Sequence, residues 1–386
     1  MKIGLLGHGT IGTGVDHIVK GRDDMEVTRI LSLIIDAEMQ GRTARDIDDI
    51  TEDPEIDTVV EVMGGIHPAY EFIVKAMKAG KNVTTANKAV VAAYYDEFVR
   101  LAKECGVVFR CTAAVGGGIP WLINLERAGR VDPIDEVGGI MNGTTNFIMN
   151  AMKEENADFA DTLKKAQALG FAEADPSADI DGLDIRRKLN ISANIAFGAE
   201  IPEESIDTFG IRNVKDADIE YAKVSQKVLK LIACGKKQED GRIAAFVEPM
   251  LLKTTDPKAS VPSNYNLVYY HAKNGGMQSF IGEGAGRYPT AYNVVQDLVD
   301  ILYVKPGFYT DSFVPAVPDN STVRHSYYVR TAVPDEYLKS ITELSGTVDG
   351  FDFAVTKPVP VREMHAWAKE QIKKDPALFF AGITEA

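Results

Sequence analysis

The chain has 386 residues, 45% of them hydrophobic and 25% charged, and its formal net charge is −14 at pH 7. This length predicts two or three domains. So acidic a surface repels phosphate, which disfavours nucleic acid and anionic membranes as partners. The sequence enters an apolar strand pattern at once and holds no apolar run long enough to span a bilayer, so neither a signal peptide nor a membrane anchor is expected.

The three cysteines are Cys105, Cys111 and Cys234. Their odd number and their lack of metal-ligand spacing favour reduced thiols, and therefore a cytoplasmic protein. Cys111 lies close to a glycine-rich loop, but a small buried residue is favoured there over a nucleophile.

A glycine-rich turn follows the first predicted strand. Its letters are Gly7-His8-Gly9-Thr10-Ile11-Gly12, and a helical pattern of apolar residues comes after it. In such a turn Gly7 permits the tight bend, Gly9 lets a pyrophosphate approach the backbone, and Gly12 lets the helix pack closely on the strand. A plain strand–helix turn can have the same composition. The strand–turn–helix context nevertheless favours a dinucleotide site formed by Gly7, Gly9, Thr10, Ile11 and Gly12.

Strands and helices alternate through the rest of the first third of the chain. The pattern predicts strands over 27–35, 57–62, 82–85 and 107–110, with amphipathic helices over 70–79 and 94–105. Strands separated by helices imply right-handed βαβ units, and hence a Rossmann-type, doubly wound parallel sheet in an α/β protein. We expect residues 1–134 to form this nucleotide-binding domain, completed by residues from about 286 to 313.

The second strand is predicted to run up to Asp36, where an acidic residue reaches the adenosine ribose. Asp36 would accept hydrogen bonds from the ribose hydroxyls and repel a 2′-phosphate. Ile35 precedes it, at a position where NADP-using proteins often carry arginine. NAD is therefore favoured as the cofactor. NADP stays open, because Arg42 and Arg45 could approach a phosphate, and Asp36 could also be a plain surface-turn residue.

From about residue 135 the alternation gives way to segregated helices and strands. Helices are predicted over 159–169, 184–197 and 219–234, followed by strands over 243–252, 265–272 and 277–281. This order predicts an α+β substrate-binding and dimerisation domain over 135–285, with helices on one face of its sheet. A helix is then predicted within 284–302, a linker over 314–322, and a tail over 323–386 whose strand–helix–strand–helix order includes a helix over 335–344.

Three polar segments are candidate sites with simpler alternatives. Asp184 and Lys188 follow an acidic loop and are four residues apart, so they share a helix face, yet an exposed helix ion pair would explain them. Asn142-Gly143 is typical of a hairpin turn. Lys88 follows a predicted strand end, where ligands of α/β sheets bind, but a solvated lysine at a helix start fits equally well.

Six segments, in this order, resemble homoserine dehydrogenase. They are the glycine loop, 64–69 with 83–89, 113–120, 139–147, the acidic run 169–184 with Lys188 four residues after it, and 284–291. Together they cover roughly the first 310 residues, and the acidic run is by itself highly specific. The resemblance implies NAD(P)-dependent interconversion of L-aspartate 4-semialdehyde and L-homoserine, in threonine, methionine and isoleucine biosynthesis, by a homodimer.

The resemblance also implies roles for individual residues. Lys188 would be the proton donor. Lys88 would contact the substrate carboxylate or carbonyl near the nicotinamide, and the two lysines would be the catalytic residues that polarise and protonate the carbonyl. The residues implied to bind substrate are Glu173, Asp179, Asp184, Gly143 and Thr144. Further cofactor contacts are implied at Gly64, Asn87, Lys88 and Gly286. A protonated lysine among carboxylates suits aldehyde reduction, because the oxygen needs a proton as hydride reaches the carbon.

One loop departs from the family pattern. The family usually has Glu-Ala-Ser-Val or Glu-Ala-Thr-Val where this chain has Thr112-Ala113-Ala114-Val115. In the family, carbonyls of this loop and the glutamate hold a sodium-like cation. The carbonyls of Val115, Gly117 and Ile119 could still bind Na⁺ or K⁺, but loss of the carboxylate predicts a weak cation site or none.

The tail and the substrate leave alternatives open. Residues 326–330 resemble the opening strand of an ACT module, but the tail is short and lacks the Asp-x-Pro-Gly turn, so a degenerate ACT-like segment is expected. A reductase of another amino-acid aldehyde, or a nucleotide sensor without turnover, are the rival functions. Aspartate-semialdehyde dehydrogenase is disfavoured because Cys111 is not placed as a nucleophile.

Overall fold

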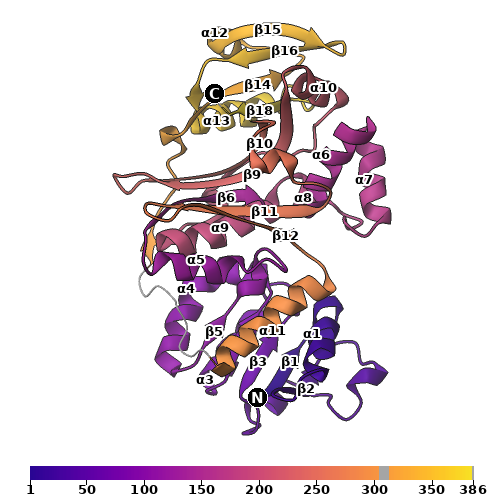
Figure 1. Ribbon diagram of the computed structural model, residues 1–386, viewed down its shortest axis with the longest axis vertical. Helices are drawn as coiled ribbons and strands as arrows, with labels where there is room; N and C mark the ends of the chain where they lie inside the picture. The colour runs from indigo at the N-terminus through magenta and orange to yellow at the C-terminus, as the bar shows by residue number, and fades with distance from the viewer. Residues whose placement is uncertain (304–312, 385–386) are drawn as a thin grey trace. The chain divides into compact units, whose positions relative to one another are not determined.

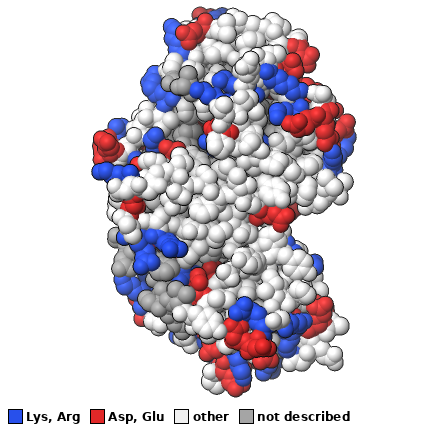
Figure 2. Space-filling model, in the orientation of Figure 1, with Lys and Arg blue, Asp and Glu red and all other residues white. Residues whose placement is uncertain are grey.

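The computed structural model describes residues 1–303 and 313–384, which form two compact units (Figure 1). Unit 1 comprises Met1–Pro133, Asn194–Glu200 and Gly282–Pro315, and unit 2 comprises Ile134–Ala193, Ile201–Ile281 and Ala316–Ala386. Within the described residues, no helix combines the length and apolar character that crossing a membrane requires. On the face drawn in Figure 2, acidic and basic side chains lie in mixed groups separated by broad uncharged areas.

Unit 1 contains a five-stranded parallel sheet in the order β2-β1-β3-β4-β5. Its strands are β1 (Lys2–Leu6), β2 (Glu26–Leu31), β3 (Thr58–Glu61), β4 (Asn82–Thr85) and β5 (Phe109–Arg110). The chain runs outward from β1 first to one side and then to the other, so the carboxyl ends of β1 and β3 flank a topological switch point, where doubly wound folds bind ligands. The predicted Rossmann-type sheet is confirmed.

Helices cover this sheet. They are α1 (Thr10–Lys20), α2 (Asp48–Thr51), α3 (Ala69–Lys78), α4 (Lys88–Cys105), α5 (Trp121–Gly129) and α11 (Arg287–Tyr303), with 3-10 turns η1 (Ala37–Met39) and η2 (Thr112–Ala114). Val15 of α1 and Leu298 of α11 share one buried core with Leu5 of β1, so α11 packs beside α1 although it is distant in sequence (Figure 1). Part of the segment expected to complete this domain, 304–312, lies outside the described residues.

One strand prediction and one helix prediction are wrong, each for a physical reason. The second strand ends at Leu31 rather than near Asp36, and Ile34 and Ile35 are exposed in the loop that follows. The predicted helix over 219–234 is a shorter helix, α10 (Asp216–Val224), followed by β9 (Lys227–Lys237). Residues 228–233 of β9 are all buried, and a strand buried on both faces lacks the alternation that distinguishes it from a helix.

Unit 2 is organised on an 11-stranded sheet among the described residues. Its main path is β12-β11-β6-β9-β10-β18-β14-β16-β15, and β8 and β17 pair beside it. The strands of its first part are β6 (Ile134–Ile140), β9, β10 (Ile243–Lys253), β11 (Tyr265–Ala272) and β12 (Gly276–Glu283). Helix α6 (Gly143–Glu155) packs on β9 and β11, and α7 (Phe159–Ala168) packs beside α6 (Figure 1). The acidic run forms α8 (Ser177–Ile180) and α9 (Leu183–Phe197).

The tail continues the sheet of unit 2. Its elements are β14 (Arg324–Arg330), α12 (Glu336–Ile341), β15 (Thr342–Val348), β16 (Phe351–Thr356), α13 (Val361–Gln371) and β18 (Phe379–Ile383). This β-α-β-β-α-β order, with spatial order β18-β14-β16-β15, is ferredoxin-like. β18 pairs in parallel with β10 through Met250 and Gly382. The predicted helix over 335–344 is wrong at its end, where β15 begins, and β18 was not predicted; the ACT-like resemblance stays a prediction.

Short segments complete the described chain. The minor strands are β7 (Ala199–Glu200), β8 (Asp207–Thr208), β13 (Val314–Pro315) and β17 (Val359–Pro360). The remaining 3-10 turns are η3 (Glu203–Ser205), η4 (Pro257–Ser260) and η5 (Asn320–Thr322).

Candidate functional site

In unit 2, one asparagine joins two carboxylates at the start of α6. Asn142 follows β6 and caps α6, because its Oδ1 accepts from the backbone N–H of Thr145 at 2.9 Å. Its Nδ2 donates to Asp179 Oδ1 at 2.7 Å and to Asp184 Oδ2 at 2.9 Å. Both amide hydrogens are therefore used to hold the two acids together. The hairpin turn considered for Asn142-Gly143 is wrong, since these residues begin a helix.

Lys188 completes this cluster. Its Nζ lies 2.8 Å from Asp184 Oδ2 and donates to the Met141 carbonyl at 2.7 Å. Lys188 is 6% exposed and Asp184 5% exposed, so the two form a buried ion pair across one turn of α9, not a solvated one. A neighbouring carboxylate favours the protonated amine, which is the form that can donate a proton.

Asp179 differs from Asp184 in its environment. It is half-buried on α8, and burial raises its pKa, as does the charge of Asp184, whereas its hydrogen bond from Asn142 acts in the opposite direction. The Thr144 hydroxyl donates to the Phe171 carbonyl, which ties α6 to the acidic loop.

Gly143 and Glu173, two of the predicted substrate-binding residues, do not take part in the hydrogen bonds of this cluster. A Cβ on Gly143 would lie 2.6 Å from the carbonyl oxygen of Asn264, so glycine is required there for packing. Glu173 is exposed, and its carboxylate makes no hydrogen bond or ion pair with the described residues. The structure therefore brings Asp179, Asp184 and Lys188 together and leaves Glu173 apart from them.

In unit 1, the three glycines of the first turn are not equivalent. Gly7 has φ +95°, and a Cβ on Gly12 would lie 2.1 Å from the Gly7 carbonyl oxygen, so these two close the strand–helix turn. A Cβ on Gly9 would meet no described heavy atom within 4 Å. Open space above Gly9, beside the first-turn amides of Thr10 and Ile11, is what a bound pyrophosphate needs.

Asp36 is linked to the glycine loop through a buried histidine. His8 Nδ1 lies 2.8 Å from Asp36 Oδ2, and this hydrogen bond holds the pKa of Asp36 below its ordinary value. Asp36 also accepts from the backbone N–H groups of Glu38 and Met39, at 2.9 and 3.2 Å. These contacts fix the carboxylate, which remains 41% exposed at its side chain.

The Arg42 side chain is paired with a carboxylate, that of Asp16. Its two terminal nitrogens donate to Asp16 at 2.6 and 2.9 Å, and Lys20 lies 2.9 Å from the same carboxylate. Burial alone would raise the pKa of Asp16, but the hydrogen bonds from these two cations lower it to about 2. Arg45 pairs with Asp49 at 2.8 Å. Both arginines that could have met a 2′-phosphate are thus paired with carboxylates.

Asn87 organises the carboxyl ends of β3 and β4. Its side chain caps α4 by accepting from the N–H of Ala89 at 3.2 Å, and it donates to the Gly65 carbonyl at 2.6 Å. Gly64, with φ +85°, forms the loop that is held in this way. Lys88 is half-buried and is the first residue of α4.

The glycine-rich loop after η2 meets α11. The Asn293 side-chain amide donates to the carbonyls of Gly117 and Ile119, two of the three predicted cation ligands. Thr112 is buried, and its backbone N–H donates to Asp297 of α11 at 3.0 Å. Gly286, with φ +122°, makes the turn that leads into α11.

Comparisons with known proteins agree on one family. Residues 120–299 match the family model described as homoserine dehydrogenase, and residues 7–111 match its NAD binding domain. The chain is 37% identical over 357 residues to the homoserine dehydrogenase of Bacillus subtilis, covering 87% of this chain and 82% of that one. This chain belongs to the homoserine dehydrogenase family. The predicted family, and with it an NAD(P)-dependent oxidoreductase, is confirmed.

Solved structures of homoserine dehydrogenases have the same fold. The enzyme from Thiobacillus denitrificans superposes with a TM-score of 0.85 at 30% identity, covering 100% of this chain and 98% of that one. A hyperthermophilic archaeal homoserine dehydrogenase mutant in complex with NADPH gives a TM-score of 0.68 at 26% identity, over 79% of this chain and 98% of the archaeal one.

Asn142 was expected at a candidate site, but its helix cap and its bonds to two carboxylates were not predicted, and neither were the contacts of His8 and Asn293. Asn142 had a usable signal, because asparagine directly before a helical pattern is a common N-cap. The contacts of His8 and Asn293 had none, since their partners lie 28 and about 175 residues away along the chain.

Proposed function

We propose that this chain oxidises L-homoserine to L-aspartate 4-semialdehyde, and reduces it back, with Lys188 as the proton-transfer residue. The observation that carries the assignment is the buried cluster of Lys188, Asp184, Asn142 and Asp179. In reduction, a hydride from the nicotinamide adds to the aldehyde carbon and a proton reaches the oxygen. The Lys188 ammonium supplies that proton, and Asp184 keeps the amine protonated beforehand.

The two carboxylates also account for an amino-acid substrate. Asp179 and Asp184 are joined by Asn142, and one cation, Lys188, faces Asp184. A substrate ammonium group placed against Asp179 would offset the second negative charge, whereas a plain aldehyde would not. Thr144, which is bonded to the acidic loop, would then border the substrate. The role earlier implied for Glu173 has less support, because its carboxylate is exposed and apart from this cluster.

We propose that unit 1 binds the dinucleotide and unit 2 the amino acid. The pyrophosphate would lie over Gly7, Gly9, Thr10, Ile11 and Gly12, where the turn leaves open space and the helix amides are positive. The nicotinamide half would be bordered by Gly64, Asn87, Lys88 and Gly286. Lys88 begins α4 beside the Asn87 cap, so its charge lies at the carboxyl edge of the sheet.

We propose NAD as the preferred cofactor. Asp36 is held by His8 and two backbone N–H groups as an ionised acceptor for ribose hydroxyls, and its charge would repel a 2′-phosphate. Arg42 would have to leave a two-point ion pair with Asp16 to serve that phosphate. The archaeal homoserine dehydrogenase mutant was solved in complex with NADPH, and the preference proposed for this chain rests on Asp36 and Arg42.

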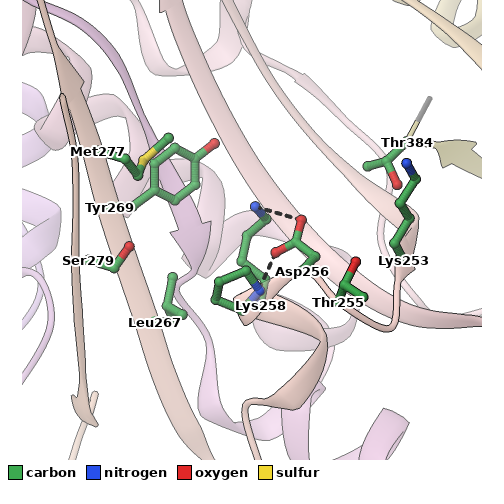
Figure 3. A pocket seen from close by; sticks show the side chains of 10 residues that line it. Lys253, Thr255, Asp256, Lys258, Leu267, Tyr269, Met277, Ser279 and Thr384 are labelled. Carbon is green, nitrogen blue, oxygen red and sulfur yellow. Dashed lines mark hydrogen bonds and ion pairs between the residues drawn. The ribbon is translucent and has the colours of Figure 1, made fainter. Parts of the chain in front are cut away.

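We propose a homodimer and a cytoplasmic location. Met277 and Ile281, which are 53% and 60% exposed, point to one side of the edge strand β12. Beside them a hollow of about 340 Å³ is lined by Tyr269, Ser279 and the Lys258–Asp256 ion pair (Figure 3). A second copy covering this face would bury the apolar side chains. All three cysteines are free thiols, as in a reducing compartment.

The direct test is homoserine-dependent reduction of NAD and NADP at alkaline pH. The comparison compounds are 2-aminobutyrate, which lacks only the hydroxyl group, and 4-hydroxybutyrate, which lacks only the ammonium group. The proposal predicts turnover of homoserine only and a higher kcat/KM with NAD. Equal turnover of 4-hydroxybutyrate and homoserine would contradict the role of the carboxylate pair, and no turnover of homoserine would contradict the function.

A further inference from the structure

Asn293 lies on the buried face of α11 with its side-chain amide directed at the glycine-rich loop. The residue is 1% exposed. Its Nδ2 donates to the Gly117 carbonyl and, at 2.9 Å, to the Ile119 carbonyl. An amide nitrogen has two hydrogens, so both are used by these two oxygens.

The two carbonyl oxygens converge on one nitrogen atom. A cation coordinated by both carbonyls would need the same space, because both oxygens lie within hydrogen-bond distance of Nδ2. The Ile119 carbonyl also accepts from the backbone N–H of Trp121 at 2.7 Å, which further lowers its capacity as a ligand. The loop of this chain therefore does not fit the sodium-like cation implied by the family resemblance.

The charge of the loop agrees with this geometry. Thr112 stands where the family pattern has glutamate, so this position supplies no carboxylate for a cation. The nearest acidic group of α11, Asp297, already accepts from the Thr112 N–H at 3.0 Å and the Thr84 hydroxyl at 3.1 Å. Asp297 is buried, and burial raises its pKa to about 6.

We propose that the Asn293 amide takes the place of the monovalent cation in this loop, so that the protein needs neither Na⁺ nor K⁺. Asn293 is then a positioning residue: it holds the Gly117 and Ile119 carbonyls with two neutral donors. Gly117 has φ +55°, and a Cβ there would lie 2.5 Å from the Gly284 carbonyl carbon, so this fixed segment packs on the turn that leads into α11. The inference deepens the proposed function, since the loop belongs to the proposed cofactor-binding unit.

The first test compares the thermal unfolding midpoint of the wild-type protein in choline chloride, NaCl and KCl at equal ionic strength. The choline ion is too large for the loop, so it controls for salt effects alone. We expect the same midpoint in the three salts, and the same kcat/KM for homoserine. A higher midpoint in NaCl or KCl than in choline chloride would overturn the proposal, because a ligand that binds the folded state stabilises it.

The second test uses Asn293→Asp. Replacing the amide by a carboxylate removes both donors and places a carboxylate oxygen beside the carbonyl oxygens of Gly117 and Ile119. Three converging oxygens, one of them charged, are suitable ligands for a cation. We expect this variant to unfold at a lower temperature than wild type in choline chloride and to regain a few degrees in NaCl or KCl. The control is Asn124→Asp, since Asn124 also donates to a carbonyl, that of Pro120, but is half-buried at the surface.

If the thermal unfolding midpoint of Asn293→Asp is equal in the three salts, the Asn293 amide does not occupy the position of a cation, and the proposal is contradicted. If the variant does not fold, the wild-type salt comparison alone still decides the matter. The unfolding measurements do not depend on turnover. If the protein does not turn over homoserine, the unfolding measurements can still be interpreted. If the wild-type protein is more stable in NaCl or KCl, this inference is wrong but the proposed reaction is unaffected.

Discussion

Lys188 and Asp184 lie one helical turn apart on α9 and form an ion pair of 2.8 Å in the interior of unit 2. A buried ion pair contributes little to the free energy of unfolding, because removing two charges from water costs several kcal/mol per ion before the pair forms. Its retention beside a second carboxylate and a bridging amide is understandable if the charges act on a substrate.

Asn142→Ser tests the bridge between the two carboxylates. Serine is also a good N-cap, so the start of α6 should persist and the unfolding midpoint should stay close to wild type. Loss of the two donors to Asp179 and Asp184 should lower kcat/KM for homoserine by about 10- to 100-fold, as expected for hydrogen bonds to charged groups. Steady-state kinetics with homoserine varied and NAD saturating measures this. A loss confined to the KM for NAD would contradict the assigned position.

Asp36→Ser tests the cofactor preference. Removing the carboxylate frees the position of a 2′-phosphate from repulsion and removes the acceptor for the ribose hydroxyls. The ratio of kcat/KM for NAD to that for NADP should fall by about tenfold, the effect of one charged hydrogen bond. His8→Asn, which keeps a polar group near Asp36, should shift the ratio less. An unchanged ratio in Asp36→Ser would rule out Asp36 as the discriminating residue.

Gly9→Ala and Gly12→Ala should have different effects on thermal stability and NADH binding. A Cβ on Gly12 would lie 2.1 Å from the Gly7 carbonyl, so Gly12→Ala should lower the unfolding midpoint and weaken NADH binding together. A Cβ on Gly9 meets no described atom within 4 Å, so Gly9→Ala should unfold like wild type yet bind NADH more weakly, because the methyl group occupies the pyrophosphate space. NADH fluorescence titration and thermal unfolding of both variants check this. Equal NADH affinity in Gly9→Ala and wild type would contradict the proposed phosphate site.

The ionisation of Glu248 is expected to govern the loss of folding stability at acidic pH. It is fully buried on β10, with His325 at 2.9 Å and His365 at 2.8 Å. Burial would raise its pKa, but the hydrogen bonds from the two histidines outweigh burial and lower it below the ordinary 4.5. Because the pKa is lower in the folded state, this group stabilises the protein at pH values above the ordinary value, and that stabilisation is lost as the pH falls through the folded pKa.

Glu248→Gln should therefore be less stable than wild type at neutral pH, by about 1.5–3 kcal/mol, the contribution of hydrogen bonds to a charged group. Its stability should decrease less steeply than that of wild type as the pH falls below about 4.5, since the titrating group is gone. Urea unfolding across this pH range gives both quantities. Parallel pH profiles of the two proteins would show that Glu248 does not govern the acid limit.

The fold could be predicted from sequence where periodicity was unambiguous. The glycine turn and the alternating strands and helices predicted the parallel sheet of unit 1, and the helix carrying Asp184 and Lys188 was predicted within one residue of its start. The prediction failed for β9, whose residues are buried on both faces, and for the loop after Leu31, where exposed apolar residues continue a strand-like pattern.

The site could be predicted only in part because several of its contacts join distant segments. The i, i+4 spacing of Asp184 and Lys188 indicated a shared face, but not that the face is buried. Nothing in the local sequence indicates that His8 supports Asp36 or that Asn293 reaches Gly117, because these contacts exist only once the sheet and α11 have packed. The family resemblance supplied the candidate residues, and packing determines what each of them touches.

The most direct test of the central claim is the rate of homoserine-dependent NAD reduction by wild type and Lys188→Ala, with Lys164→Ala as the control. Lys164 is an exposed helix lysine that pairs with Asp161 at 3.1 Å. We predict that Lys188→Ala lowers kcat by about 10²- to 10⁴-fold, the contribution of a positioned acid–base group, while it still binds NADH like wild type and Lys164→Ala keeps full activity. Near-normal turnover by Lys188→Ala would contradict the proposed proton transfer.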